Sequence, residues 1–398
     1  MTEQLVMELL RGSSKLFLHP LFYLSFVVVF LVGYLRIQRE RRDFHVRIYD
    51  MYQELRFLLP IGIVLGVVGS LITLGIGVSI PFSAIVVMGA ITFILMISSK
   101  LRLVSAAYTI GTSYLILVIM DYFQWEFSVF NVTVTGHNVE ELVGMTVLLA
   151  LLLIIEGLII QLNGAKQTSP QFTKSTRGLT VGTHISKRLW LLPMFLLIPG
   201  EGFSLPFDWW PIATVGEQSF LLILLPFPIG FYQRIQSTLP KRAIKETGKQ
   251  VFWLGGFVGI AAASGYVSPT LSALAVAVAI VGREWVALKQ RSQEDNRPYF
   301  FSPQDKGMMV LGVIPNSPAD KLGLTIGEVI EKVNGFYVKD EQSFYDALQK
   351  NRAYCKIEVL DINQQIRFVK GALYEGDHHE LGILFPKEDK QWEQAERA

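Results

Sequence analysis

The sequence predicts a polytopic α-helical membrane domain of about eight spans, plus or minus one, followed by a small water-soluble α+β domain. Of the 398 residues, 51% are hydrophobic and 18% are charged, which is too apolar for soluble domains alone. After Arg297 the composition changes abruptly to short alternating segments and turns. We therefore expect a membrane domain at 1–298, a soluble domain at 299–387 and a charged tail at 388–398.

Apolar runs near the roughly 20 residues needed to cross a bilayer are the candidate spans. They lie at 17–35, 58–80, 81–99, 103–120, 143–162, 189–200, 214–232, 251–267 and 269–282. The segment 189–200 is short and contains Pro193 and Pro199, so a re-entrant or broken helix is an alternative there. Gly265 to Pro269 interrupts the last apolar stretch, which favours a helical hairpin.

Lys and Arg gather in alternate connections between these runs. The basic connections are 36–56, 100–102, 166–188, 234–249 and 283–297, whereas 121–142 and 201–213 contain acidic residues and no Lys or Arg. The positive-inside rule places the basic connections, and the soluble domain after them, in the cytoplasm. The N-terminus is then outside if the first run spans. Alternatively, residues 2–10 lie along the inner surface as an amphipathic helix.

Beyond Arg297 the pattern predicts strands, turns and one amphipathic helix. The expected elements are a strand at Gly307–Ile314, a turn opening a short helix at Asn316–Ala319, a strand at Glu328–Val333, a turn at Asn334-Gly335, and strands at Lys356–Asp361 and Gln365–Lys370. Asp340 or Ser343 is expected to cap a helix in which Phe344, Ala347 and Leu348 share one face.

The string VIPNSPADKLGLTIGEVIEKVNG, Val313 to Gly335, resembles the PDZ domains attached to bacterial HtrA and site-2 proteases. Glu328 stands where that family usually has Asp, which keeps the charge. The resemblance implies a Φ-G-Φ loop that holds a peptide carboxylate, and a ligand that adds as an extra strand. No such loop precedes Gly307, but Leu381-Gly382-Ile383 has the required form. We therefore expect a circularly permuted PDZ domain whose binding loop and strand come last.

On this interpretation a ligand strand pairs with the backbone after the loop and meets the helix face. The predicted peptide-binding residues are Leu381, Gly382, Ile383, Leu384, Phe385, Phe344 and Leu348. The alternative is that Leu381 to Phe385 form only a closing core strand.

Catalytic constellations are missing from the sequence. His378-His379-Glu380 lacks the second His of a His-Glu-x-x-His metalloprotease site, and Ser264 has no later histidine in a span to act as its base. One cysteine, Cys355, cannot form an intramolecular disulfide. We expect no enzyme activity, metal or cofactor. Glu156, inside LLLIIEGLII, is either a transport site or a carboxylate packed inward on a neighbouring hydroxyl or Gly-rich backbone.

FLHPLFY (Phe17 to Tyr23) and YLRIQRERRDFHVRIYDMYQELRF (Tyr34 to Phe57), with many spans and a C-terminal PDZ pattern, resemble the MinJ family. The resemblance implies a polytopic division-site adaptor of rod-shaped Gram-positive bacteria that links the curvature-sensing protein DivIVA to the ATPase MinD. Its implied partners are DivIVA-like, MinD-like and other divisome proteins and the lipid bilayer, without nucleic acid. Its implied location is the cell membrane, enriched at septa and poles. The alternatives are a transporter with a regulatory PDZ domain and a degenerate PDZ-containing intramembrane protease relative.

Overall fold

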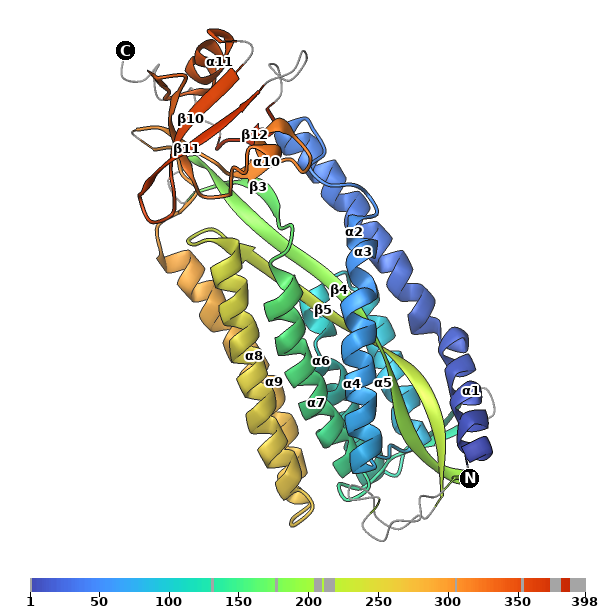
Figure 1. Ribbon diagram of the computed structural model, residues 1–398. Coiled ribbons are helices and arrows are strands. Elements are labelled where there is room, and N and C mark those ends of the chain that lie inside the picture. The colour runs from blue at the N-terminus through green and yellow to red at the C-terminus, as the bar shows by residue number, and fades with distance from the viewer. Residues whose placement is uncertain are drawn as a thin grey trace.

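The computed structural model describes residues 2–129, 132–175, 178–203, 210, 219–304, 306–351, 354–372 and 381–386. An elongated bundle of helices surrounds a long β-ribbon, and a small C-terminal domain sits at one end of the bundle (Figure 1). The predicted charged tail, 388–398, lies outside the described residues.

The bundle helices are α1 (Thr2–Leu18), α2 (Pro20–Phe44), α3 (Gln53–Leu58), α4 (Pro60–Ile76), α5 (Phe82–Ile97), α6 (Ala106–Tyr122), α7 (Val143–Ile159), α8 (Pro240–Ser264) and α9 (Thr270–Asn296), with a 3₁₀ turn η1 (Leu101–Val104) and a π-helical turn η2 (Ile160–Gly164). Among the described residues, those long and apolar enough to cross a membrane are Pro20–Phe44, Gln53–Ile76, Val143–Gly164 and Thr270–Asn296. The apolar helices α5 and α6 are shorter. The predicted hairpin over 251–282 is confirmed, because α8 and α9 are separate helices.

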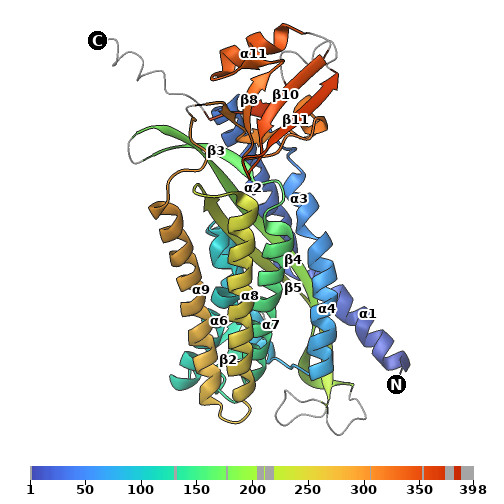
Figure 2. The ribbon, with the colours of Figure 1, turned by 60° about the vertical axis from the view of Figure 1, so that its left-hand side comes forward.

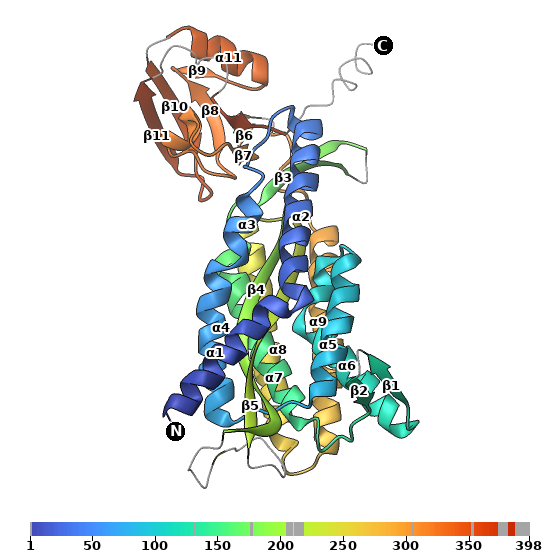
Figure 3. The ribbon, with the colours of Figure 1, turned by 90° about the vertical axis from the view of Figure 1, so that its right-hand side faces the viewer.

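The two ends of the bundle differ in charge as predicted. The C-terminal ends of α2 and α9 and the start of α8 lie at the end that carries the C-terminal domain, and these hold basic connections (Figures 1 and 3). The strands β1 (Glu126–Val129) and β2 (Val132–Thr135), in an acidic connection, lie at the opposite end (Figure 3). Helix α1 also extends toward that opposite end. Residues 2–10 therefore lie away from the basic connections, while the side of the membrane on which they lie stays a prediction.

The prediction of helices at 189–200 and 214–232 is wrong. Residues 214–218 of the second segment lie outside the described residues. A three-stranded antiparallel ribbon replaces them, made of β3 (Ser169–Lys174), β4 (Thr180–Phe203) and β5 (Phe220–Ile235) in that order. Pro193 and Pro199 in β4, like Pro226 and Pro228 in β5, would each remove a hydrogen bond from a helix. Two long strands thus occupy the places of the two predicted helices.

Helix α4 covers the outer edge of β4. A Cβ added at Gly66 would lie 2.4 Å from the carbonyl oxygen of Pro193, so the two backbones are in direct contact. One turn on, Ser70 Oγ accepts from the Phe195 N–H (2.9 Å) and Thr73 Oγ1 donates to the Phe195 carbonyl (2.9 Å). Among apolar helices, backbone N–H and C=O groups on a strand edge are costly when they lack hydrogen-bond partners. The face of α4 that carries Gly66, Ser70 and Thr73 approaches this edge closely and supplies such partners.

Two prolines and a glycine determine how the ribbon fits against its neighbours. Pro193 pairs with Pro226, and the Pro193 carbonyl faces α4, so the nitrogen atoms of this pair point away from the ladder. Proline has no N–H, and neither edge is left with an unmet donor at this pair. On β5, a Cβ at Gly230 would lie 2.1 Å from the Leu101 carbonyl of η1, so η1 packs directly on that face of the strand.

The C-terminal domain contains β6 (Met308–Met309), β7 (Gly312–Val313), α10 (Pro318–Lys321), β8 (Val329–Val333), β9 (Phe336–Tyr337), α11 (Glu341–Gln349), β10 (Tyr354–Leu360), β11 (Ile366–Ala372) and β12 (Ile383–Leu384). The main sheet has the order β11-β10-β8-β6, with β9 on β8, and β12 pairs with β7. The predicted turn is confirmed, since Asn334 and Gly335 have φ of 50° and 86°. The predicted cap is confirmed as a capping box of Asp340 and Ser343 on α11.

Candidate functional site

Strand β12, where the peptide site is predicted, closes the C-terminal domain against β7. The Ile314 N–H donates to the Gly382 carbonyl (2.8 Å) and the Ala319 N–H to the Leu381 carbonyl (3.0 Å). Gly382 has a φ of 78°, a conformation that favours glycine. Because Gly382 bonds toward β7, antiparallel alternation turns the backbone groups of Ile383 away from it. That free side is where an added strand would pair.

The helix residues predicted for the site lie beside β12. Phe344 and Leu348 of α11 are 1% and 0% exposed and share the domain core with Leu381. The Phe385 ring packs edge-on against Phe344, with centroids 5.4 Å apart. The predicted residues are thus close together, but the side chains of Phe344 and Leu348 are core contacts. The partly exposed side chains at this place are Ile383 and Phe385.

Leu384 points the other way, into a contact between the C-terminal domain and the bundle. Its side chain is 8% exposed and clusters with Ile48 and Tyr49, in the loop after α2. The domain rests at this place on the end of α2 and on β3 (Figure 2). The two faces of β12 therefore have different neighbours, namely α11 on one face and the bundle on the other.

His184 of β4 is the buried polar centre of this domain contact. Its Nε2 lies 2.9 Å from the Leu311 carbonyl of the C-terminal domain, and its Nδ1 lies 3.0 Å from Thr168 Oγ1. A carbonyl can only accept, so Nε2 donates and Nδ1 accepts from the hydroxyl. Burial lowers the pKa of His184 to about 4, and His184 is therefore neutral at physiological pH.

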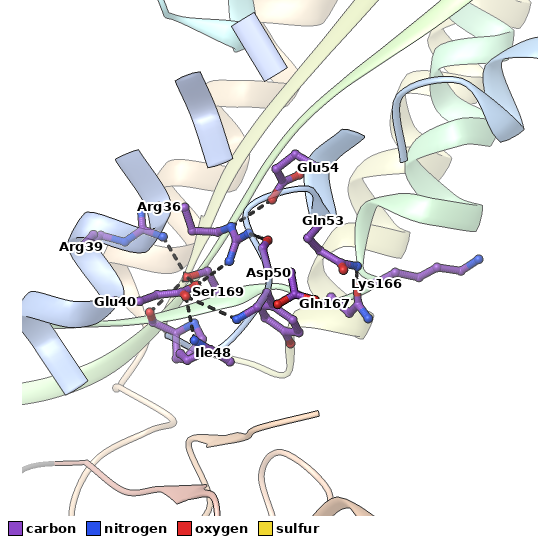
Figure 4. Close-up of polar contacts among 12 residues, drawn as sticks. Arg36, Arg39, Glu40, Ile48, Asp50, Gln53, Glu54, Lys166, Gln167 and Ser169 are labelled. Carbon is purple, nitrogen blue, oxygen red and sulfur yellow. Dashed lines mark hydrogen bonds and ion pairs between the residues drawn. The ribbon is translucent and has the colours of Figure 1, made fainter. Parts of the chain in front are cut away.

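A buried ion network lies beneath the contact, at the end of α2 (Figure 4). Arg36 pairs with Glu40 (3.0 Å) and with Glu54 (3.2 Å), and Arg188 of β4 also pairs with Glu54. All four side chains are buried, between 0% and 7% exposed. Buried charges are tolerated when paired in this way, and the network fixes α2 and α3 against β4.

The same network holds the loop on which Leu384 rests. Glu40 Oε2 accepts from the Ile48 N–H (2.9 Å), and its Oε1 accepts from Ser169 Oγ of β3 (2.8 Å), which in turn accepts from Arg39 (2.9 Å). Helix α2, the loop and β3 are thus joined through one carboxylate. The spacing of Arg36 and Glu40, one helical turn apart, could have indicated a pair. Arg188 and Ser169 lie more than 100 residues away in the sequence, so no local pattern indicates that they join this network.

Glu156 is fully buried and fully paired. Its carboxylate accepts from Ser105 Oγ (2.7 Å) and the Ala106 N–H (3.1 Å), and it pairs with Arg283 of α9 (3.1 Å). Of the two interpretations of Glu156, this geometry matches the carboxylate that packs inward on a neighbouring hydroxyl. Glu156 therefore joins α6, α7 and α9.

No group of three or more His, Cys, Asp or Glu side chains gathers into a metal site within the described ranges. Of the motif His378-His379-Glu380, all three residues lie outside those ranges. The geometry that remains is a peptide-like groove edge, a domain contact, the buried ion network around Arg36 and the buried pair of Glu156 with Arg283.

Comparison with known proteins identifies both parts of the chain. Residues 309–360 match the PDZ domain family. The chain is 41% identical over 391 residues to "Cell division topological determinant MinJ" of Bacillus subtilis (strain 168), covering 98% of each chain. The chain belongs to the MinJ family. It is also 24% identical over 363 residues to "Probable cell division topological determinant MinJ" of Lacticaseibacillus paracasei, covering 89% of this chain and 92% of the relative.

The MinJ resemblance predicted from Tyr34 to Phe57 is confirmed, and the C-terminal domain is a PDZ domain. The segment that carried the resemblance is the one that builds the buried ion network around Arg36, Glu40 and Glu54. Its distinctive charges hold a loop against the PDZ domain.

Proposed function

We propose that this MinJ-family chain is a non-enzymatic membrane adaptor for division-site placement. It links a DivIVA-like protein to a MinD-like ATPase, so that the division inhibitor acts near poles and septa. The observation that carries the proposal is near full-length similarity to a protein named as a cell division topological determinant. The PDZ domain supports it, because such domains bind peptide segments of partner proteins.

We infer that helices α2 and α4 to α9, with strands β4 and β5, cross the bacterial cell membrane. The basic connections at the PDZ end support a cytoplasmic PDZ domain. We also propose that the domain is a circularly permuted PDZ whose ligand pairs with Ile383 to Phe385. The outward-facing backbone of Ile383 and the positive φ of Gly382 support this groove.

Deletion of the gene in its own bacterium tests the adaptor role. The deletion should give filaments and minicells, and the MinD-like ATPase should lose its enrichment at septa by fluorescence microscopy. Re-expression of the wild-type chain should restore both. Normal cell length with unchanged ATPase placement would overturn the proposal.

Substitution at the groove edge tests the peptide site. Gly382 is unsuitable, because a Cβ there would lie 2.4 Å from the Ser317 Cβ at a φ of 78°. Ile383→Asp instead places a charge at the partly exposed edge. It should weaken capture of the DivIVA-like or MinD-like partner by the full-length protein about tenfold, as expected for a buried interface contact.

The matched control is Ile366→Asp on β11, where the side chain is 60% exposed. It should leave partner capture unchanged, and circular dichroism should show that both variants remain folded. Equal capture by wild type and a well-folded Ile383→Asp would favour the closing-strand alternative.

A further inference from the structure

A cavity of about 700 Å³ lies at the PDZ end of the bundle, between η1, the end of β5 and the last turns of α9. Its volume is in the range of small-ligand sites, roughly 300–1,000 Å³. Beside it on α9, Trp285 and Leu288 are 57% and 56% exposed. Exposed Trp next to charged residues is typical of the membrane–water boundary. The cavity therefore lies at the depth of lipid head groups.

Six cationic and three acidic side chains line the cavity. Each acid already has partners: Glu284 binds Arg102 and Tyr108, Glu294 accepts from the N–H groups of Gln236 and Ser237, and Asp295 pairs with Arg291. By contrast, the side-chain ammonium groups of Lys100 and Lys187 have no hydrogen-bond or ion-pair partner in the part of the chain that the structure describes. The cavity thus has uncompensated positive charge.

Two observations show which polar groups at the cavity lack a partner within the described ranges. The Lys187 side chain is half-buried and has no counter-ion among the described residues. Gln233 is 2% exposed, and neither its amide nitrogen nor its amide oxygen has a partner among the described residues. A buried, unpaired amide is costly. A ligand with both acceptor and donor groups would satisfy it.

We propose that this cavity binds a phosphate-bearing anion, held by Lys187, Lys100 and the side-chain amide of Gln233. Phosphate oxygens accept from the two ammonium groups and from the amide nitrogen, and a hydroxyl on the ligand donates to the amide oxygen. The phosphate comes from the head group of a membrane phospholipid, such as phosphatidylglycerol, or from a free phosphate compound. Basic pockets between transmembrane helices on the cytoplasmic side bind lipid head groups in this way.

Native mass spectrometry of the full-length protein in neutral detergent tests the site. With phosphatidylglycerol added, the wild type should retain lipid, and Lys187→Gln and Gln233→Leu should each reduce retention about tenfold, the effect of losing a hydrogen bond to a charged group. Lys245→Gln, an exposed lysine of α8 outside the cavity, is the matched control and should retain lipid normally.

Melting temperatures distinguish the two sources and guard against misfolded variants. Phosphatidylglycerol should stabilise the wild type more than Lys187→Gln, whereas without lipid the variant should melt no lower than the wild type, because the Lys187 side chain then has no partner to lose. Stabilisation of the wild type by inorganic phosphate, weakened in Lys187→Gln, would assign the cavity to a free phosphate compound. If neither phosphatidylglycerol nor inorganic phosphate distinguishes the wild type from Lys187→Gln, the proposal is overturned.

Discussion

His184 is a neutral imidazole buried between two domains, and its environment makes the domain contact dependent on pH. Its pKa is about 4 in the folded protein and near 6.5 when exposed. As pH falls, His184 therefore binds a proton in the separated or unfolded state at a higher pH than in the folded state. The contact should be at full strength above about pH 6.5 and should weaken progressively toward pH 4.

Replacement of this imidazole should remove that dependence. His184→Gln keeps a donor for the Leu311 carbonyl but cannot titrate. Between pH 7.5 and 5, the wild type should lose on the order of 2 kcal/mol of stability that the variant does not lose. Thermal melting of both proteins in detergent at the two pH values measures this difference. Parallel losses would show that other groups control the pH response.

Glu156 and Arg283 form a pair whose members depend on each other. Glu156→Gln leaves the Arg283 guanidinium buried without its counter-ion. Loss of one member of a buried pair costs roughly 3–5 kcal/mol, so the variant should melt well below the wild type. The double variant Glu156→Leu/Arg283→Met removes both charges and should recover most of the loss. Full stability of Glu156→Gln alone would contradict a structural role.

Among the elements, the packing of α4 on β4 is the most sensitive to side-chain size. Gly66→Ala would push a Cβ against the Pro193 carbonyl at 2.4 Å and should destabilise the protein by about 1–3 kcal/mol. Gly75→Ala is a control on the same helix, because no atom lies within 4 Å of its added Cβ. It should be neutral or stabilising by about 0.5–1 kcal/mol. Chemical or thermal unfolding in detergent measures both, and equal effects would argue against direct backbone packing.

The sequence predicted the elements whose signals are local. Helix α7, the α8–α9 hairpin, the Asn334-Gly335 turn and the α11 cap all follow from nearby residues. The β4–β5 ribbon was missed, because an apolar run among spans has the same composition whether it is a helix or a strand. The strand conformation depends on α4, which covers the edge of β4 and lies more than 100 residues away in the sequence. The local signals against helices were the prolines in both segments, Pro193 and Pro199 in β4 and Pro226 and Pro228 in β5.

The candidate site was predictable to a similar degree. The Φ-G-Φ loop around Gly382 was visible in the sequence, and its positive φ agrees with that pattern. The burial of Phe344 and Leu348 was not visible, because a helix face that lines a groove and one that fills a core share the same spacing. The domain contact through His184 depends on two segments 127 residues apart and left no pattern.

At the scale of the whole molecule, the PDZ domain is attached to the bundle through one face of β12. Leu384→Asp would place a charge between Ile48 and Tyr49, and a buried Leu contributes about 1.5–3 kcal/mol. Hydrogen exchange should therefore increase in the loop after α2 and at Gly182 of β4, whose N–H donates to the Phe301 carbonyl (2.9 Å). Strands β8 and β10 should keep their protection. Ile383→Asp, on the opposite face of the same strand, should leave exchange in that loop unchanged. Unaltered exchange in Leu384→Asp would show that the contact does not hold the domain.

The ribbon also constrains the order in which the protein is built. An exposed strand edge is unfavourable in hydrocarbon, so on the proposed membrane arrangement β4 and β5 require covering elements before they can stay in the membrane. The elements that cover them, α1, α4 and η1, all come earlier in the chain. When the ribbon leaves the ribosome, its docking surface has therefore already been synthesised. Helices α8 and α9 follow and pack over α7, which makes the N-terminal half of this protein the template on which the rest is inserted.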